Sequence, residues 1–392
     1  MKTNEIVLVH QSLSNPGGLE KHTLKIANAF LKAGKPPALL METPLPDGLL
    51  PSEVSTVYLP IRRKTTFLKV REFNQRCQDW KQKYQPKVFF GMDRISSASH
   101  VRLGNGSHRA YLSRMIEASL YSPIRKFLNP LHRSILRIER EMFENPYLEK
   151  AIANSYMVKG EIVRDYSIDP SKITVIHNGV EWKELAPEFE NWVETKNKIA
   201  QSLRLDPHIY QFLFIGNGYS RKGLLPLLEG LSLLKERNYH LSVLGKEKNM
   251  TPFKMRVKAL GLDSHVTFFG AQTNPLPFYK MADSLLVPSV YDPFANVTIE
   301  ALAMGLFVVS SKYNGGKEVL TEETGKMIDN LFDPDSICHA LQLALERPKT
   351  WISSELIRNS VKKFDFSLQL QKVIDVCPVS YTHLTLPTSD LV

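Results

Sequence analysis

The stretch FLFIGNGYSRKG, residues 212–223, joins a short apolar run to a glycine-bearing loop, and an apolar helical pattern follows it. Four uncharged apolar residues in a row, 212–215, are typical of a strand that is buried on both faces of a sheet. Residues 223–235 then carry the apolar spacing of a helix. A buried strand, a glycine loop and a helix in this order form the repeating unit of an α/β fold with a parallel sheet.

The same alternation continues on both sides of this stretch. Strand patterns lie at residues 6–9, 38–41, 87–92, 151–153 and 173–176 before it, and at 240–244, 266–269, 284–287 and 307–310 after it. Residues 180–208 are charged and lack a clear period, so we place a domain boundary there. The sequence therefore predicts two doubly wound, Rossmann-like domains, residues 1–185 and 186–375. Ligands of such sheets bind at the carboxyl ends of the strands, so we expect the active site in a cleft between the domains.

Length and composition agree with this organisation. The chain has 392 residues, 43% hydrophobic and 23% charged, which is typical of a soluble protein of two domains. Its three cysteines, Cys77, Cys338 and Cys377, lie far apart in sequence, which indicates neither a metal site nor a disulfide framework. We recognise no signal peptide or membrane span and expect a cytoplasmic protein. Residues 376–392 differ in character from the rest and resemble either an appended vector-derived tail or a disordered one.

Positive charge is concentrated in the first half of the chain. The formal net charge is +10, and residues 61–140 alone hold 18 Lys and Arg against 5 Asp and Glu. Hydrophobic residues are interspersed with these charges, at Phe67, Leu68, Phe127, Leu128, Leu131 and Ile135. Such a surface suits an anionic membrane, although the charges could simply be solvated. A nucleic-acid-binding protein is the competing class, but the basic region shows neither a recognised binding motif nor an aromatic stacking platform.

Two acidic residues stand eight positions apart in YDPFANVTIEA, residues 291–301. Asp292 precedes a predicted helix start and Glu300 lies within that helix, so both could face one ligand. The free amides of a helix start suit an anionic or hydroxyl-rich group, and Glu300 could accept hydrogen bonds from a ribose diol. In the alternative, Asp292 merely caps the helix and Glu300 faces solvent.

The glycine loop at residues 216–223 offers Arg221 and Lys222 as fixed charges for a diphosphate. Its spacing matches neither a P-loop nor a dinucleotide-binding fingerprint. The simpler alternative is that both cations are only solvated.

The first domain contributes two further glycine-bearing loops. Pro16, Gly17 and Gly18 follow the first predicted strand, where backbone amides can face a ligand. Residues 103–109 form another loop, in which Asn105 precedes His108 by three positions. A plain turn and a surface histidine are the corresponding alternatives.

Taken together, these motifs resemble glycosyltransferase family 4. The turn at 16–18, the segment VIHNGV at 175–180, the loop at 221–223, the strand at 266–270 and the acid pair at 292 and 300 occur in the order found in that family. The similarity runs from about residue 5 to 375. The chain is most similar to the lipopolysaccharide core glucosyltransferases, which add the first glucose to heptose.

The resemblance implies a retaining enzyme of the GT-B fold that binds a nucleoside diphosphate sugar. It implies transfer of a hexose, glucose from UDP-glucose, to a lipopolysaccharide core or another phosphorylated glycolipid, at the inner face of the cytoplasmic membrane. No metal and no other cofactor is expected, since cations and helix-end amides neutralise the leaving diphosphate. The implied donor-binding residues are Gly17, Gly18, Arg221, Lys222, Phe294, Ala295, Asn296 and Glu300, and the implied catalytic residues are His108, Asp292 and Asn105.

Two positions depart from the family pattern. Asp292 stands where the family normally has Glu, and Asn105 stands where the most similar relatives have Asp. An Asn cannot act as a base, so its role would be hydrogen bonding. Because a few contacts decide donor choice, a mannosyl or heptosyl donor remains an alternative, as do a nucleotide-sugar epimerase and an inactive scaffold.

Overall fold

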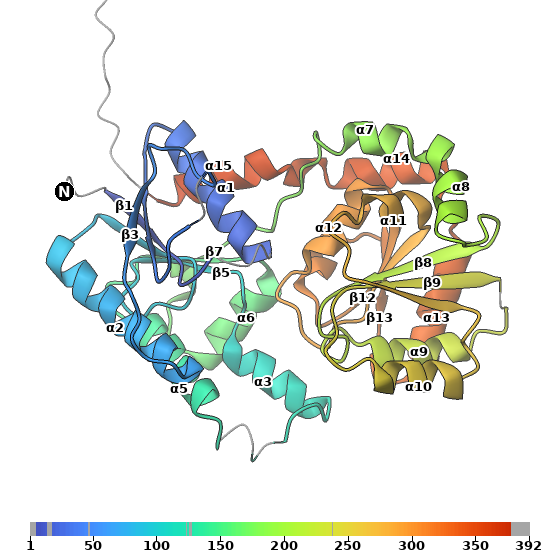
Figure 1. The fold of residues 1–392 in the computed structure, drawn as a ribbon, viewed down its shortest axis with the longest axis horizontal. Coiled ribbons are helices and arrows are strands. Elements are labelled where there is room, and N and C mark those ends of the chain that lie inside the picture. The colour runs from blue at the N-terminus through green and yellow to red at the C-terminus, as the bar shows by residue number, and fades with distance from the viewer. Residues whose placement is uncertain are drawn as a thin grey trace, which may run out of the picture.

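The computed structural model describes residues 5–13, 18–45, 48–122, 124, 128–236 and 238–377, and for residues 18 and 19 the backbone alone. Two α/β domains lie side by side, the first formed by the N-terminal half of the chain and the second by most of the C-terminal half (Figure 1). The predicted fold class, two Rossmann-like domains that face a cleft, is confirmed.

The first domain contains a seven-stranded parallel sheet in the order β3-β2-β1-β4-β5-β6-β7. Its strands are β1 (Ile6–Val9), β2 (Ala38–Met41), β3 (Ser55–Tyr58), β4 (Val88–Gly91), β5 (His100–Leu103), β6 (Lys150–Ala153) and β7 (Ile173–Val175). The described helices are α1 (Gly18–Lys32), α2 (Thr66–Tyr84), α3 (His108–Glu117), α5 (Pro130–Phe143) and α6 (Tyr156–Asp165), with a 3-10 turn at Pro170–Lys172.

The second domain contains a six-stranded parallel sheet in the order β10-β9-β8-β11-β12-β13. Its strands are β8 (Tyr210–Ile215), β9 (Tyr239–Leu244), β10 (Val266–Gly270), β11 (Ser284–Val287), β12 (Phe307–Ser311) and β13 (Gly325–Ile328). The helices are α7 (Ala186–Glu190), α8 (Trp192–Ser202), α9 (Leu224–Ser232), α10 (Thr251–Ala259), α11 (Leu276–Met281), α12 (Asn296–Ala303), α13 (Pro334–Leu345) and α14 (Trp351–Ser360), with 3-10 turns at Gly315–Val319 and Lys362–Phe364. The strand order reverses beside β8, which is where such sheets bind ligands.

The apolar runs of the sequence are strands with both faces covered. In β1, Val7 and Val9 belong to one hydrophobic cluster, whereas Ile6 and Leu8 belong to the cluster on the other face of the sheet. Successive side chains of a strand point to opposite faces, so a strand between two layers of helices needs an apolar residue at every position. The uncharged run at 6–9 was therefore a reliable signal.

The last helix, α15 (Phe366–Asp375), leaves the second domain and returns to the first, where it lies beside α1 (Figure 1). Its Val373 and Ile374, together with Cys377, are buried in the hydrophobic cluster that contains Ile6. The predicted second domain, 186–375, thus needs a correction at its end, because the apolar face of α15 covers the first sheet. Within the predicted tail, residues 376 and 377 belong to the fold, and residues 378–392 lie outside the described residues.

Candidate active site

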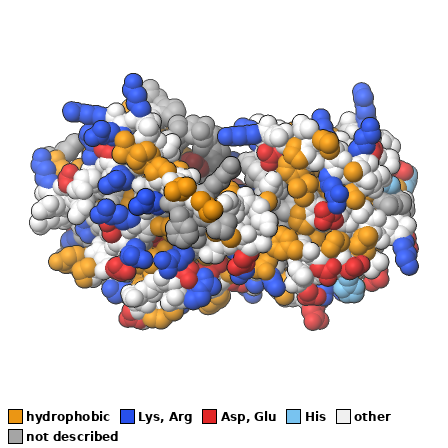
Figure 2. All heavy atoms as spheres, turned by 90° about the horizontal axis from the view of Figure 1, so that it is seen from below, with side chains coloured by type: hydrophobic (Ala, Val, Ile, Leu, Met, Phe, Trp, Pro, Cys, Tyr) orange, Lys and Arg blue, Asp and Glu red, His pale blue; other side chains and the backbone are white. Residues whose placement is uncertain are grey.

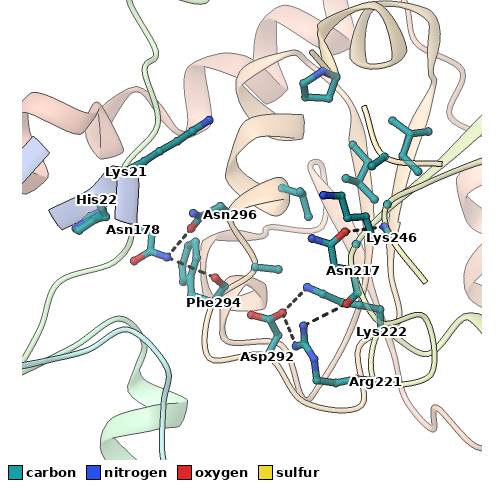
Figure 3. A pocket seen from close by; sticks show the side chains of 18 of the residues that line it. Lys21, His22, Asn178, Asn217, Arg221, Lys222, Lys246, Asp292, Phe294 and Asn296 are labelled. Atoms are coloured by element: carbon teal, nitrogen blue, oxygen red, sulfur yellow. Dashed lines mark hydrogen bonds and ion pairs between the residues drawn. The ribbon is translucent and has the colours of Figure 1, made fainter. Parts of the chain in front are cut away.

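A cavity of about 1000 Å³ lies between the two domains, where segments that follow β5, β8 and β9 meet (Figure 3). The first domain lines it with Lys21, His22, Arg102, Gly104, Asn105 and Asn178. The second domain lines it with residues 215–217, 221–222, 244–246, 271–273, 275, 292 and 294–297. These segments lie at the carboxyl ends of both sheets, as predicted for a ligand cleft.

Glycines allow the loop after β8 to fold tightly beneath this cavity. Gly223 has φ +76°, and a Cβ on it would lie 1.7 Å from the Pro288 carbonyl oxygen, so only glycine fits. A Cβ on Gly216 would lie 2.8 Å from Cγ of Lys222. The aliphatic part of Lys222 therefore rests against the glycine backbone, and its ammonium group is directed toward the cavity (Figure 3).

Asp292 holds the two predicted diphosphate-binding cations together. Its Oδ2 lies 2.5 Å from Lys222 Nζ and 3.5 Å from Arg221 Nη1 (Figure 3). The Asp292 side chain is 10% exposed and that of Lys222 12%, so little water screens this pair. The cluster presents two cations and one carboxylate to the same cavity. Such an arrangement can exchange the carboxylate for a bound diphosphate or accept hydrogen bonds from sugar hydroxyls.

The loop that leads into α12 is held by Asn314, which is fully buried. The Asn314 Oδ1 accepts hydrogen bonds from the amides of Ala295 and Gly316, each at 3.0 Å, and its Nδ2 donates to the hydroxyls of Thr298 and Ser310. This side chain therefore fixes the residues before the helix. The first amides of α12, which have no partner within a helix, border the cavity at Asn296.

Glu300 lies one turn along α12 from Asn296 and is not among the residues that line the cavity. The Tyr279 hydroxyl donates a hydrogen bond to Glu300 Oε2 at 2.8 Å. Burial raises the pKa of Glu300, while this hydrogen bond and the charges of Lys21 and Lys25 oppose the rise. The two lysines come from α1 of the other domain, so Glu300 lies close enough to the first domain for their charges to act on it.

Of the site residues predicted in the first domain, the structure places some at the cavity and others away from it. Asn105 and its neighbour Gly104 line the cavity. His108 does not: it begins α3, its Nε2 lies 3.1 Å from Nδ1 of His132 on α5, and its amide donates to Glu139 at 2.8 Å. Gly18 is the first residue of α1, and Gly17 lies outside the described residues.

Asn178, for which the sequence predicts no role, lines the cavity and joins the two domains. Its Oδ1 accepts a hydrogen bond from Arg102 at 2.7 Å, and its Nδ2 donates to Asn296 Oδ1 at 2.6 Å and to the Phe294 carbonyl at 3.4 Å (Figure 3). One carboxamide thus connects β5 of the first domain to the start of α12 in the second. The segment VIHNGV contributes to the family resemblance, but its Asn contacts residues more than 70 positions away, which spacing cannot reveal.

Two further contacts join the domains beside the cavity. Glu318 of the second domain accepts hydrogen bonds from the amides of Tyr156 and Met157 at the start of α6 and contacts His177 at 2.9 Å. Tyr291 donates to Glu161 of α6 at 2.8 Å. The residue before Asp292 is therefore anchored to the first domain, so the position of the cation cluster depends on how the domains meet.

Five further polar residues line the cavity although the sequence predicts none of them for the site: Lys21, His22, Arg102, Asn217 and Lys246. Lys21, His22 and Lys246 stand in polar runs typical of a solvated surface, and Asn217 lies in the glycine loop at 216–223 without a charge to distinguish it. Asn217 Oδ1 accepts a hydrogen bond from the Lys246 amide at 2.7 Å, which joins the loops after β8 and β9. Across the part of the chain that the structure describes, no group of three or more His, Cys, Asp or Glu side chains is placed to hold a metal ion. Metal independence stays a prediction.

Two family models match the chain, one on each domain. The glycosyltransferase family 4 model matches residues 16–183, and the model of glycosyl transferases group 1 matches residues 195–363. Together they leave out only the ends of the chain and the segment between the domains.

Similar proteins are glycosyltransferases as well. An uncharacterised glycosyltransferase of Methanocaldococcus jannaschii is 29% identical over 221 residues, which are 55% of this chain and 54% of that protein. The chain thus spans about half the length of this relative. The lipopolysaccharide glucosyltransferase WaaG of Escherichia coli is 21% identical over 372 residues, 92% of this chain and 95% of that protein.

Solved structures share the fold. The crystal structure of WaaG superposes with a TM-score of 0.77 at 19% identity and covers 95% of this chain and 99% of its own. HepE of Anabaena, in complex with UDP and glucose, gives a TM-score of 0.66 at 15% identity and covers 95% and 98%. Since two glycosyltransferase models cover most of the chain and the fold is shared over nearly its whole length, the chain belongs to the glycosyltransferases: its first domain matches family 4, its second matches group 1, and the whole has the GT-B fold and resembles the lipopolysaccharide core enzymes.

Proposed function

We propose that this enzyme transfers a hexose, glucose, from UDP-glucose to a phosphorylated glycolipid of the lipopolysaccharide core type, with retention of configuration. One observation carries the proposal: Arg221, Lys222 and Asp292 meet at a cavity that residues of both domains line. The names of WaaG, a lipopolysaccharide glucosyltransferase, and of HepE, solved with UDP and glucose, support the donor and the acceptor.

In the proposed reaction the cation cluster stabilises the leaving group. The nucleoside diphosphate would take the place of the Asp292 carboxylate beside Lys222 and Arg221, and the amides at the start of α12 would add hydrogen bonds. Negative charge develops on the diphosphate as the glycosidic bond breaks, so these fixed donors stabilise the transition state more than the bound donor. They would do this without a metal ion.

The sugar would lie between the two domains. Asp292, released from Lys222, would accept hydrogen bonds from sugar hydroxyls, and Asn105 would hold the sugar or the acceptor from the first-domain side. Glu300 would bind the ribose at the edge of the cleft. His108 would reach the sugar only after its contact with His132 breaks, so its contribution requires a rearrangement of the start of α3.

The acceptor proposal places the first domain on the anionic inner face of the cytoplasmic membrane. In the connection between α3 and α5, Ile124 is 71% and Leu128 73% exposed. Arg133, Arg137 and Arg140 are exposed on the adjoining helix α5. Figure 2 shows Lys and Arg side chains interspersed with hydrophobic ones over the first-domain half of the face seen there. Each surface cation near an anionic leaflet adds about 1 kcal/mol of attraction. Insertion of the Ile124 and Leu128 side chains into the bilayer would add to it.

The bilayer contact would be peripheral. Of the helices in the described part of the chain, none combines the length and the apolar character needed to span a membrane. Phe127, which the sequence predicts for this surface, lies outside the described residues, as do Arg125 and Lys126 of the basic segment 61–140.

A donor screen tests the proposal. Thermal denaturation of the full chain is followed with UDP-glucose, UDP-galactose, GDP-mannose and ADP-heptose in turn, and we expect the melting temperature to rise most with UDP-glucose. Lys222→Ala and Glu300→Ala should abolish the rise, whereas Lys258→Ala, which removes an exposed lysine of α10, should leave it unchanged. Release of UDP with a heptose-containing core glycolipid as acceptor then measures transfer. Absence of any shift with all four sugars would overturn the proposal.

A further inference from the structure

Arg102 is a buried cation at the end of β5, on the wall of the cavity that faces the second domain. The residue is 6% exposed, yet it borders the cavity. Burial lowers the pKa of its guanidinium to about 10. Arg102 therefore carries its charge at neutral pH, in a place where charge is costly to hold.

The described residues offer this guanidinium few hydrogen-bond acceptors and no counter-ion. Among the described residues, this guanidinium makes one hydrogen bond, from Nη2 to Asn178 Oδ1, a neutral amide oxygen, at 2.7 Å. Among the residues that the structure describes, no Asp or Glu oxygen lies within ion-pair distance of it, whereas Arg221 and Lys222 across the cavity share Asp292. A buried charge without a counter-ion is strongly unfavourable. An anion supplied from outside the chain would remove this cost.

The space around Arg102 indicates the side from which an anion would come. On one side lies a gap of about 10 Å³ between β5 and α15, lined in part by Phe366, Leu370 and Val373. A gap of this size holds about one water molecule at most. On the other side lies the main cavity of about 1000 Å³. An ion with several oxygens fits only the second space.

His22 lies beside Arg102 and adds a second unsatisfied group. It borders the same two spaces, and its Nε2 is buried without a hydrogen-bond partner among the described residues. Burial, and then the charges of Arg102 and Lys25, lower the pKa of this imidazole well below its usual range. A neutral imidazole whose Nε2 carries the hydrogen donates to an anion without adding to the charge already present.

We propose that Arg102, with His22 beside it, forms an anion-binding subsite on the first-domain wall of the cavity, and that this subsite takes a phosphoryl group opposite Arg221 and Lys222. The inference rests on the proposed function, which brings phosphoryl groups from two sources to the cavity: the diphosphate of the donor and a phosphate of the acceptor. Both present the same oxygens to a guanidinium. Because Asn178 links Arg102 to Asn296, an anion here also contacts the interdomain connection.

Calorimetric titration of the full chain and of Arg102→Gln tests the subsite. The ligands are UDP, uridine and inorganic pyrophosphate, followed by inorganic phosphate added to UDP-saturated enzyme. Gln keeps a donor for Asn178 and loses the charge. Arg256→Gln, which neutralises a surface arginine paired with Glu229, is the matched control and should bind every ligand as the wild type does.

Two outcomes support the subsite and identify its source. If Arg102→Gln lowers the affinity for UDP and pyrophosphate by about ten-fold or more and leaves the affinity for uridine unchanged, the bound group is the donor diphosphate. If UDP binds equally well but phosphate no longer binds to UDP-saturated enzyme, the group is an acceptor phosphate. Unchanged affinity for all four ligands, in a variant that melts like the wild type, overturns the subsite.

Failure of the proposed function is distinguishable from failure of the subsite. A wild-type chain that binds pyrophosphate through Arg102 but no nucleoside diphosphate would refute only the function, and a chain that binds neither would refute both. Should Arg102→Gln not fold, Arg102→Lys retains the charge but not the planar fork, so about a three-fold loss is expected. Unchanged affinity in that variant would again overturn the subsite.

Discussion

Replacement of Asn314 by alanine should destabilise the second domain and loosen the start of α12. The substitution removes the oxygen that accepts from the amides of Ala295 and Gly316, in a place without exposure to solvent. Each buried amide left without a partner costs about 1–3 kcal/mol, so the two amount to about 4 kcal/mol. The hydroxyls of Thr298 and Ser310 lose a donor but can still donate elsewhere, and they add little.

Thermal and urea denaturation measure this loss. For a unit of this size, 1 kcal/mol shifts the melting temperature by about 2–4 °C, so the transition of the second domain should fall by about 8–16 °C. Asn330→Ala is the matched control, because Asn330 is exposed and its Oδ1 accepts only from the nearby Phe332 amide. A change below about 1 kcal/mol in Asn314→Ala, or an equal change in the control, would refute this account of the loop.

Three further perturbations follow from the site, the domain contact and the basic surface. Lys222→Met should lower the affinity for UDP at least about ten-fold, as measured by calorimetry. Asp292→Asn should raise this affinity, since no carboxylate then competes for the lysine. An equal loss of affinity in both variants would contradict the exchange of Asp292 for diphosphate. Burial raises the pKa of Glu161 to about 7, from an ordinary value of 4.5, so the folded state binds this proton more tightly than the unfolded one and the free energy of unfolding should fall as pH rises from 4.5 to 7. Glu161→Gln should remove that part of the fall, and parallel pH profiles for variant and wild type would speak against it. Leu128→Asp should reduce co-sedimentation with phosphatidylglycerol vesicles about ten-fold, whereas Leu356→Asp, at a 51% exposed site in α14, should not.

The sequence predicted the sheets well where strands are buried on both faces, because such strands need continuous apolar runs. It missed β5, where His100 and Arg102 interrupt the apolar pattern, and β3 and β13, which have residues of mixed exposure. These strands are held by backbone pairing with their neighbours: β3 with β2, β5 with β4 and β6, and β13 with β12. Backbone pairing of this kind leaves no hydrophobic pattern in the strand itself.

The sequence predicts site residues where a charged or polar side chain also lies in a loop next to a predicted strand or helix. Arg221, Lys222 and Asp292 were identified and lie together, because a loop after a strand and a loop before a helix meet at one sheet edge. His108 is implied by the family resemblance, yet its ring lies against His132. Arg102 was overlooked because nothing in the sequence distinguishes it from the other arginines of a basic region. Its significance comes from burial and from the absence of a carboxylate beside it in the described structure.

The return of α15 to the first domain means that two segments connect the halves of the enzyme, and these segments are paired with each other. The Val180 amide donates to the Phe364 carbonyl at 3.0 Å, and the Phe366 amide donates to the Val180 carbonyl at 2.8 Å. Because the two connecting segments are paired, they act as one connection, and we expect the domains to hinge there. Opening and closing of the cleft should therefore follow a single path. Separation of the halves by one cut near residue 185 would remove α15 from the first half and expose the sheet face that contains Ile6.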